Sequence, residues 1–247
     1  MNFYAYMDYG YKIGINKTQN RLDSRAAPGH LKTMSDKVSD APSVRTDILI
    51  VGGGLVGAVA ARALSTSGFD VVVIDGTDPA DAADAAFDGR ASALAYTSWR
   101  MFEALGVAEH MREHAQRIED IVVCDGRPYG GTKPGGPGPH TLHFDRREIS
   151  EGPDGEPLGW MVENRRSRQA LVKALQARPQ IKVVAPARVE GFERRAGDID
   201  LILESGDRLR GKLMVACDGR FSRLRDQAGI RAAGWSYGQH GIVTTVR

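Results

Sequence analysis

The stretch from Asp47 to Asp75, DILIVGGGLVGAVAARALSTSGFDVVVID, decides the fold. Two parts of it, Ile48–Val51 and Val71–Ile74, are continuous apolar runs, which are typical of parallel strands buried on both faces. A helical stretch joins these strands and ends at Gly68, a residue suited to a helix C-cap. Its expected apolar stripe consists of Val56, Val59, Ala60, Ala63 and Leu64. Strand, helix and strand within about 30 residues predict a right-handed parallel βαβ unit.

The loop between the first strand and the helix has the G-x-G-x-x-G spacing, with Gly52, Gly54 and Gly57 at its three positions. Such glycines permit the tight turn, the approach of a pyrophosphate and the packing of the helix on the strand. The helix N-terminus then directs free N–H groups at the phosphates. Asp75 follows about 20 residues later, where a carboxylate can accept hydrogen bonds from a ribose hydroxyl. The loop predicts dinucleotide binding, leaves FAD and NAD open, and disfavours NADP because its 2′-phosphate would face Asp75.

A second motif lies in residues 213–225, LMVACDGRFSRLR, where an apolar strand runs into Asp218 and Gly219. A purely structural interpretation is a turn after the strand, with Ser222 as a helix N-cap and Arg225 in solvent. The spacing also resembles the D-G-x-x-S-x-x-R fingerprint of the flavoprotein aromatic hydroxylases. That resemblance implies that the segment lies near FAD, with Asp218 and Arg225 on the flavin side.

Three further segments extend the resemblance. The segment DGRASALA (residues 88–95) is similar to the family's D-x-R-A segment, which implies that Arg90 reaches the flavin side and is not merely an exposed loop arginine. The segment LGWMVEN (158–164) is similar to a strand whose following helix touches FAD, which implies a contact from Asn164. The segment WSYGQ (235–239), followed by HGIVTTV, resembles the strand with which the ubiquinone-biosynthesis hydroxylases leave their FAD domain.

The resemblance spans roughly residues 45–247 and implies an α/β fold. The expected architecture is a Rossmann-type FAD-binding parallel sheet with an inserted β-meander and the start of a mixed α+β substrate domain. The implied reaction is a monooxygenation in which NAD(P)H reduces FAD, dioxygen is activated on the flavin, and an aromatic ring is hydroxylated. The implied substrate is a polyprenylated phenol of ubiquinone biosynthesis. No catalytic acid or base is identified.

Two other functions stay open at this stage. The sequence shows neither the family's second flavin motif, a G-D segment followed by a histidine, nor most of its substrate-binding sheet. The chain would then be an incomplete FAD-binding domain over residues 46–247, and a non-catalytic FAD-binding fragment is one alternative. Another FAD oxidoreductase of the same fold is the second. Residues 1–45 show no periodicity and are expected to be a disordered or non-native tail, with Met34 as another candidate start.

Composition argues against several other classes. The net charge is +2, from 33 basic and 31 acidic residues, which gives no argument for a nucleic-acid partner. The two cysteines, Cys124 and Cys217, suit neither a disulfide framework nor a zinc site and are expected to be buried. His110, Glu113 and His114 have an inverted zincin spacing on an expected helix, but no third ligand is evident, so no metal is predicted.

Two stretches bear on surface and location. Residues 126–139 contain ten Gly or Pro residues among fourteen and are expected to be a surface loop between strands at 121–124 and 141–144. No apolar run approaches the roughly 20 residues of a membrane-spanning helix, and the N-terminus lacks a secretory signal. These features predict a cytoplasmic protein, and the resemblance adds peripheral contact with the inner face of a membrane.

Overall fold

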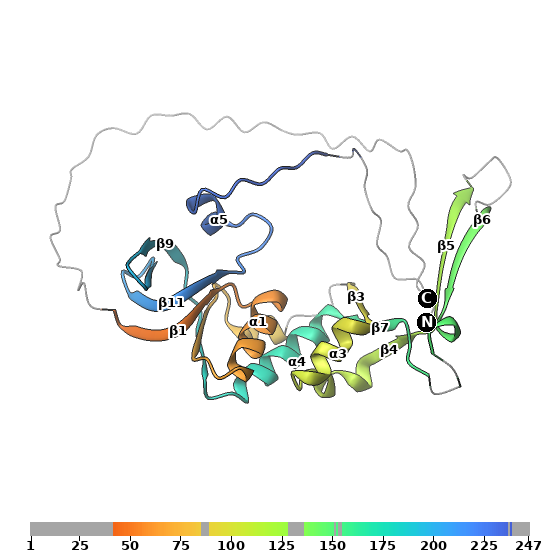
Figure 1. Ribbon diagram of the computed structural model, residues 1–247, viewed down its shortest axis with the longest axis horizontal. Helices are drawn as coiled ribbons and strands as arrows, with labels where there is room; N and C mark the ends of the chain where they lie inside the picture. The colour runs from red at the N-terminus through yellow and green to blue at the C-terminus, as the bar shows by residue number, and fades with distance from the viewer. Residues whose placement is uncertain are drawn as a thin grey trace.

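The computed structural model describes residues 42–84, 89–127, 136–150, 152, 155–236 and 238. A six-stranded sheet, with strand order β8-β2-β1-β11-β10-β9, occupies one end of the molecule (Figure 1). In chain order its strands are β1 (Val44–Val51), β2 (Val71–Ile74), β8 (Ile181–Val184), β9 (Val189–Arg194), β10 (Ile199–Leu203) and β11 (Arg208–Ala216). The first four strands in the sheet order are mutually parallel, whereas β11, β10 and β9 form an antiparallel meander. The predicted parallel sheet with an inserted meander is therefore confirmed.

The central strands alternate between two hydrophobic cores, which explains their unbroken apolar sequence. On one face, Ile48 and Ile50 of β1 pack with the helices α1 (Leu55–Thr66), α3 (Tyr96–Ala104) and α4 (Asn164–Gln176). On the other face, Leu49 and Val51 pack with residues of the meander, such as Leu201. Each of these four β1 side chains is at least 93% buried, so the strand could not carry a polar residue here without a large cost.

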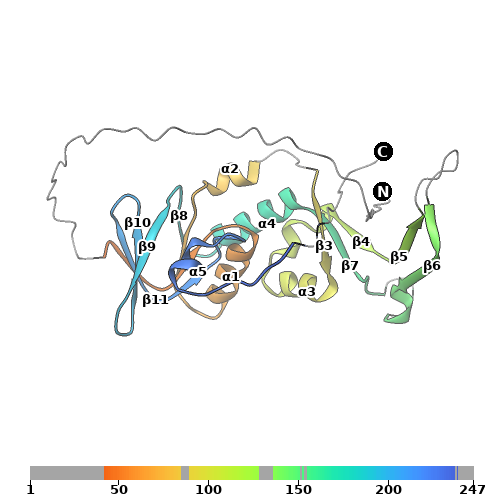
Figure 2. The same ribbon diagram turned by 90° about the horizontal axis from the view of Figure 1, so that it is seen from above.

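A second region lies beyond the helices (Figure 2). It contains a three-stranded sheet of order β3-β7-β4 and a separate two-stranded ribbon of β5 and β6. The strands are β3 (Ala91–Ala95), β4 (Ala115–Ile118), β5 (Asp120–Arg127), β6 (Gly136–Asp145) and β7 (Gly159–Glu163). Trp99 of α3 stacks on Trp160 of β7 with ring centroids 4.5 Å apart, and this contact holds the sheet against the helices. The short helices are α2 (Pro79–Asp84) and α5 (Arg223–Gln227).

The first helix differs from the expected stripe. Its buried residues are Gly57, Ala58, Ala61 and Ser65, and Val56 is 72% exposed. The reason is the close seat of Gly57 on the glycine loop, which turns the small residues of α1 inward. Val59, Ala60, Ala63 and Leu64 are partly buried against the same core.

Three other expectations need correction. Strands β5 and β6 extend into the Gly/Pro-rich stretch, because Gly126 pairs with Pro137 after an irregularity and a two-stranded ribbon tolerates proline at its edges. Residues 128–135 lie outside the described residues. Cys124 is exposed because its face of the ribbon is uncovered, whereas Cys217 is half-buried. The segment with His110 and His114 forms two separate 3-10 turns, so the two imidazoles do not share a helix face.

Several predictions fall wholly or partly outside the described residues. They concern the tail up to residue 41, Asp88, and the end of the chain from residue 239 onward. In the described part of the chain, no helix is long and apolar enough to cross a membrane.

The meander contains a buried charge network around Asp200, whose side chain is fully buried. Arg210 donates to its two oxygens at 2.5 and 2.7 Å, and Arg195 donates at 2.6 Å. The hydrogen bonds from Arg210, followed by those from Arg195, lower the pKa of Asp200 to about 2 against the effect of burial. Because the folded-state pKa lies below the unfolded value of about 3.9, the stabilisation is present above pH 4 and is lost toward pH 2.

Replacing Asp200→Asn should lower the free energy of unfolding at pH 7 by about 2 kcal/mol, because two arginines lose a charged acceptor. The difference from the unchanged chain should shrink as the pH falls from 4 to 2. Urea unfolding at several pH values measures both effects. The half-buried Asp198, at the turn before β10, is the matched control, and Asp198→Asn should change stability by less than about 0.5 kcal/mol. Equal losses in the two variants would contradict the assignment.

Candidate functional site

The glycine loop begins where β1 ends. Gly52 has a φ of +99°, which disfavours any residue with a side chain, and its N–H donates to the carbonyl of Ile74 at 2.8 Å. A Cβ atom at Gly52 would lie 2.3 Å from the carbonyl oxygen of Cys217. The loop is therefore pressed between the ends of β2 and β11, and only glycine fits at this position.

The other two glycines of the motif, Gly57 and Gly54, have different structural roles. A Cβ atom at Gly57 would lie 1.8 Å from the carbonyl oxygen of Gly52, so Gly57 permits the contact between helix and loop. Gly54 has extended backbone angles, and a Cβ atom there would meet nothing within 4 Å. Gly54 is also the N-cap of α1, and no side chain caps this helix. The helix thus presents uncapped N–H groups to open space, as a phosphate-binding site requires.

Asp75, at the carboxyl end of β2, binds the glycine loop directly. Its Oδ2 accepts a hydrogen bond from the Gly53 N–H at 2.5 Å, and its Oδ1 accepts one from the Thr77 N–H at 2.7 Å. The sequence did not predict the hydrogen bond from Gly53 to Asp75. The signal for it was the third consecutive glycine, Gly53, because a Cβ atom there would lie only 3.3 Å from the Asp75 side chain. Each carboxylate oxygen keeps acceptor capacity for a ribose hydroxyl.

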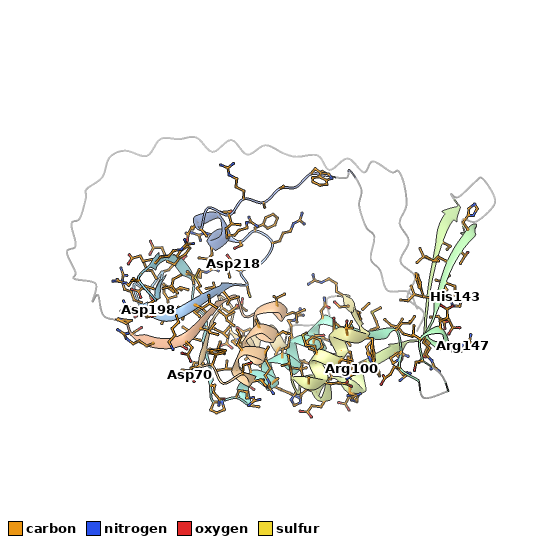
Figure 3. All side chains as sticks on the ribbon, viewed as in Figure 1. Asp70, Arg100, His143, Arg147, Asp198 and Asp218 are labelled. Carbon is orange, nitrogen blue, oxygen red and sulfur yellow. The ribbon has the colours of Figure 1, made fainter. Side chains whose placement is uncertain are left out.

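The second motif lies beside the first because β11 runs parallel to β1. The N–H of Cys217 donates to the carbonyl of Val51 at 2.7 Å, and Asp218 follows next to Gly52. Figure 3 shows Asp218 and Asp70 at opposite ends of the sheet, with Asp218 at the carboxyl ends of the parallel strands. In open α/β sheets this is the end at which ligands bind.

Asp218 has one oxygen that the described residues leave without a partner. Its Oδ2 accepts from the N–H of Leu224 at 3.3 Å, whereas its Oδ1 is buried and accepts no hydrogen bond in the described part of the chain. A buried carboxylate oxygen without a donor is costly, and a bound hydroxyl group would satisfy it. The ribose and ribityl hydroxyls of FAD supply such donors, so the residues present fit this cofactor.

The remaining residues of the second motif have local structural contacts. Gly219 adopts a φ of +93° in the turn, and Ser222 caps α5 by accepting from the Arg225 N–H at 3.0 Å. The guanidinium of Arg225 donates to Asp226 at 2.8 Å and to the carbonyl of Arg220 at 3.3 Å. These contacts are the ones expected if the segment is only a turn followed by a helix that Ser222 caps. A role for Gly219, Ser222 and Arg225 at the cofactor stays a prediction.

Arg90 and Asn164 form a second group, on the three-stranded sheet. The Asn164 N–H donates to the carbonyl of Arg90 at 3.1 Å, and Ser92 Oγ donates to Asn164 Oδ1 at 2.6 Å. Asn164 begins α4, and the Arg90 side chain is exposed. The structure thus brings these two residues together, while the glycine loop, Asp75 and Asp218 gather at the six-stranded sheet.

Groups with metal-ligating atoms lie elsewhere. Asp120, His143 and Asp145 meet on the β5–β6 ribbon, and Figure 3 shows His143 at the opposite end of the molecule from Asp218. Arg147 already pairs with Asp145 and donates to both of its oxygens. This cluster therefore does not belong to the site at the glycine loop.

A tight glycine turn into an uncapped helix, with acidic side chains at the two neighbouring strand ends, places the chain among the dinucleotide-binding proteins. Residues 45–246 match the family described as "FAD binding domain". The chain belongs to this family, and FAD is its cofactor.

Individual relatives agree with this family. The chain is 39% identical over 91% of its length to the ubiquinone hydroxylase UbiL of Rhodospirillum rubrum, covering 47% of that protein. It is 33% identical over 82% of its length to the 3-demethoxyubiquinol 3-hydroxylase of Escherichia coli, covering 48% of it. The flavin-dependent monooxygenase PieE, solved with FAD and substrate, has the same fold, with a TM-score of 0.58 at 22% identity, covering 76% of this chain and 33% of PieE. The chain spans about half the length of the two hydroxylases.

Replacing Gly57 by alanine should affect folding, whereas replacing Gly54 by alanine should affect FAD binding. Gly57→Ala should lower the melting temperature by several degrees, because the new Cβ atom overlaps the Gly52 carbonyl. Gly54→Ala should leave the melting temperature of the FAD-free chain unchanged, since its Cβ enters open space. It should nevertheless weaken FAD binding about tenfold, because the phosphates of FAD are predicted to occupy that space. Thermal unfolding without FAD and FAD titration separate the two. A clear drop in the melting temperature of the FAD-free Gly54→Ala chain would contradict the role assigned to Gly54.

Asp218→Ala should raise the Kd for FAD about tenfold, because the unpartnered Oδ1 is removed. Asp207, just before the opposite end of β11, is the matched control, and Asp207→Ala should leave the Kd unchanged. Quenching of flavin fluorescence measures both affinities. Unchanged binding in Asp218→Ala would show that this oxygen does not face the cofactor.

Proposed function

We propose that the protein containing this chain is an FAD-dependent monooxygenase that hydroxylates an aromatic ring in ubiquinone biosynthesis. The proposed substrate is a polyprenylated phenol, with NAD(P)H as reductant and dioxygen as oxidant. The observation that carries the proposal is the 39% identity to a ubiquinone hydroxylase across 91% of the chain. The names of other relatives, including the mitochondrial ubiquinone biosynthesis monooxygenase COQ6 of Mus musculus, support it.

The residues of this chain would hold the cofactor. When bound, FAD takes electrons from NAD(P)H and activates dioxygen, which is chemistry that side chains alone do not supply. The N-terminus of α1, behind Gly52, Gly54 and Gly57, would hold the pyrophosphate through backbone N–H groups. Asp75 would accept a hydrogen bond from the ribose and at the same time keep the loop in shape through Gly53.

The flavin side would be held by residues from two separate places. Asp218 Oδ1 would accept a hydrogen bond from a hydroxyl of the cofactor, which would give this buried oxygen the donor that it needs. Arg90 and Asn164, joined by a backbone hydrogen bond at 3.1 Å, would approach from the three-stranded sheet. Ser92 keeps the amide of Asn164 in place by donating to its oxygen. Loss of Ser92 would then act on the cofactor only through Asn164.

We also propose a cytoplasmic location with peripheral contact with the inner face of the membrane. The support is chemical, since a polyprenyl tail partitions into the bilayer and its phenol ring must reach the enzyme from there.

The proposal predicts a yellow protein. The purified chain should carry FAD, identified by its visible spectrum and by release of the flavin. With NADH or NADPH and a prenylated phenol, it should consume oxygen and form a hydroxylated product. Oxidation of NAD(P)H that proceeds equally under argon would instead indicate a reductase. Bound FAD without any turnover would favour the alternative of a non-catalytic FAD-binding fragment.

A further inference from the structure

Three side chains that can bind a metal ion meet on one face of the β5–β6 ribbon. They are Asp120 of β5 and His143 and Asp145 of β6, and their ligand atoms all lie within 4.8 Å of one another. The strand register explains the cluster, because Asp120 pairs directly with Asp145, and His143 lies two residues before Asp145 on the same face. His143 Nε2 lies 2.8 Å from Asp120 Oδ1. The ribbon thus presents one imidazole nitrogen beside two carboxylates.

These ligand atoms suit a zinc ion in kind and in spacing. Imidazole nitrogen and carboxylate oxygen bind zinc at about 2.0–2.2 Å, so two ligand atoms of a tetrahedral zinc ion lie roughly 3.3 Å apart. Side-chain movements of about 1 Å would bring the three atoms to this spacing. Such movements are open to His143 and Asp120, whose side chains are 49% and 53% exposed. Water can then fill the fourth position.

Asp145 is already oriented and charged for this role. Its Oδ1 accepts a hydrogen bond from the Arg147 N–H at 2.8 Å, which fixes the carboxylate at the start of the short turn Arg146–Glu148. The guanidinium of Arg147 donates to both oxygens, and these hydrogen bonds hold the pKa of Asp145 well below its ordinary value. The Arg147 side chain is 76% exposed, so it can turn into solvent. Arg147 is therefore a competitor that a metal ion would displace from Oδ2.

The position of the cluster gives a metal ion a structural use. Strands β5 and β6 form a two-stranded sheet, and no third strand in the described part of the chain pairs with them. Such ribbons are marginally stable in water. Strand β5 begins at Asp120 and β6 ends at Asp145, so an ion bound to both would join the two strands where the ribbon meets the rest of the chain.

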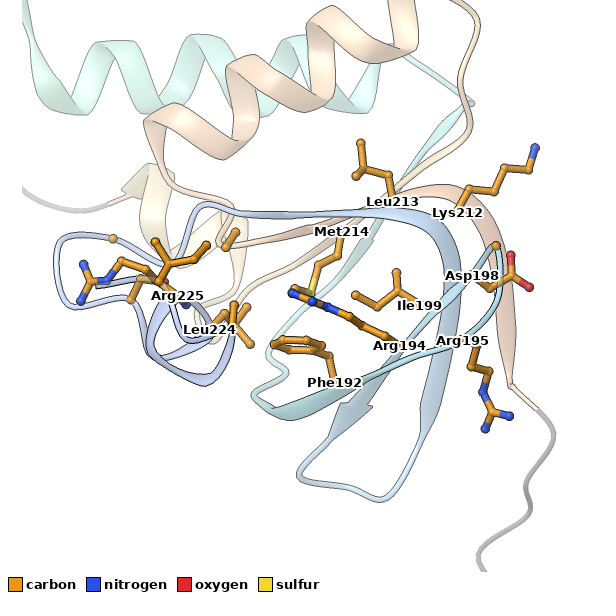
Figure 4. A pocket seen from close by; sticks show the side chains of 16 residues that line it. Phe192, Arg194, Arg195, Asp198, Ile199, Lys212, Leu213, Met214, Leu224 and Arg225 are labelled. Atoms are coloured by element: carbon orange, nitrogen blue, oxygen red, sulfur yellow. The ribbon is translucent and has the colours of Figure 1, made fainter. Parts of the chain in front are cut away.

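A groove elsewhere in the molecule lacks this chemistry. It has a volume of about 780 Å³ and lies between the meander and α5, with Phe192 and Met214 among its lining residues (Figure 4). The acidic side chain in its lining is that of Asp198. The cationic side chains in its lining are those of Arg194, Arg195, Lys212 and Arg225. This excess of positive charge repels a metal ion, whereas the ribbon cluster attracts one.

We propose that Asp120, His143 and Asp145 form a binding site for a divalent transition-metal ion, represented by zinc, that joins β5 to β6. The ion binds the neutral imidazole of His143 through Nε2 and one oxygen of each carboxylate. Arg147 leaves Asp145 Oδ2 as the ion binds. Figure 3 shows His143 and Arg147 at the opposite end of the molecule from Asp218, so this site is separate from the predicted cofactor site and does not depend on the proposed reaction.

Titration calorimetry of the metal-free full chain with zinc chloride tests the site. The chain should bind one zinc ion, and His143→Ala should weaken binding by at least about tenfold, because the nitrogen ligand is lost. The matched control is His140, which is exposed on the same strand but belongs to the other face of the ribbon. His140→Ala should leave the affinity unchanged. No zinc binding, or equal affinities of the His143→Ala and His140→Ala chains, overturns the proposal.

A second variant should strengthen binding. Arg147→Gln removes the competitor for Asp145, so zinc should bind about fivefold more tightly. The control is Arg100→Gln, an exposed arginine on α3, which should have no effect. In the unchanged chain, zinc should slow amide hydrogen exchange in residues 120–124 and 141–145 about tenfold and leave β8 unchanged. Unchanged or weaker binding in Arg147→Gln, or exchange in the ribbon that zinc does not slow, overturns the proposal.

Discussion

The structure depends on the absence of side chains at two positions of the glycine loop. Gly52 lies against the carbonyl of Cys217, and Gly57 lies against the carbonyl of Gly52 itself. Through these two contacts the ends of β1, β11 and α1 approach one another closely enough to form a single binding surface. A Cβ atom at either position would overlap a backbone carbonyl and force the loop away from β11 or α1, which would distort the predicted site for the pyrophosphate.

Three aspartates on or next to the strands of the six-stranded sheet, Asp75, Asp218 and Asp200, differ in their hydrogen-bond partners. Asp75 has its two oxygens occupied by backbone N–H groups, so it stabilises the loop whether or not a ribose is present. Asp218 shares one oxygen with the turn before α5 and keeps the other free of partners among the described residues. Asp200, on the meander, is wholly satisfied by arginines and has a structural role. The partners, and not the residue type, separate the structural carboxylate of Asp200 from that of Asp218, which is the predicted cofactor contact.

Apolar side chains are buried in the middle of the six-stranded sheet but are exposed in part of β11 and on the β5–β6 ribbon. The strands near the middle of the six-stranded sheet are packed on both faces, while β11 loses its cover beyond Gly211. The β5–β6 ribbon shows a similar imbalance, since one of its faces carries large apolar side chains that are all more than 40% exposed. These are Ile121, Val123, Leu142 and Phe144. Apolar surface of this kind is costly to leave in water.

Much of the fold could be read from the sequence because it depends on local patterns. The apolar runs at Ile48–Val51 and Val71–Ile74 predict buried parallel strands, and the three glycines with Asp75 predict the dinucleotide loop between them. The resemblance of the Asp218 segment then favoured FAD, and the family match agrees.

Only the tertiary structure decided how these parts meet. The sequence could not show that Asp75 binds Gly53, that Asp218 retains a buried oxygen without a partner, or that Val56 turns outward, because each depends on segments distant in the chain. The end of the β10–β11 pairing at Gly211 was equally hidden, since an apolar run indicates that a strand is buried but not which strands pair with it. The pattern of apolar residues within a helix or strand depends on neighbouring residues in the chain. Strand pairing and side-chain burial depend instead on contacts between segments that are far apart in the sequence.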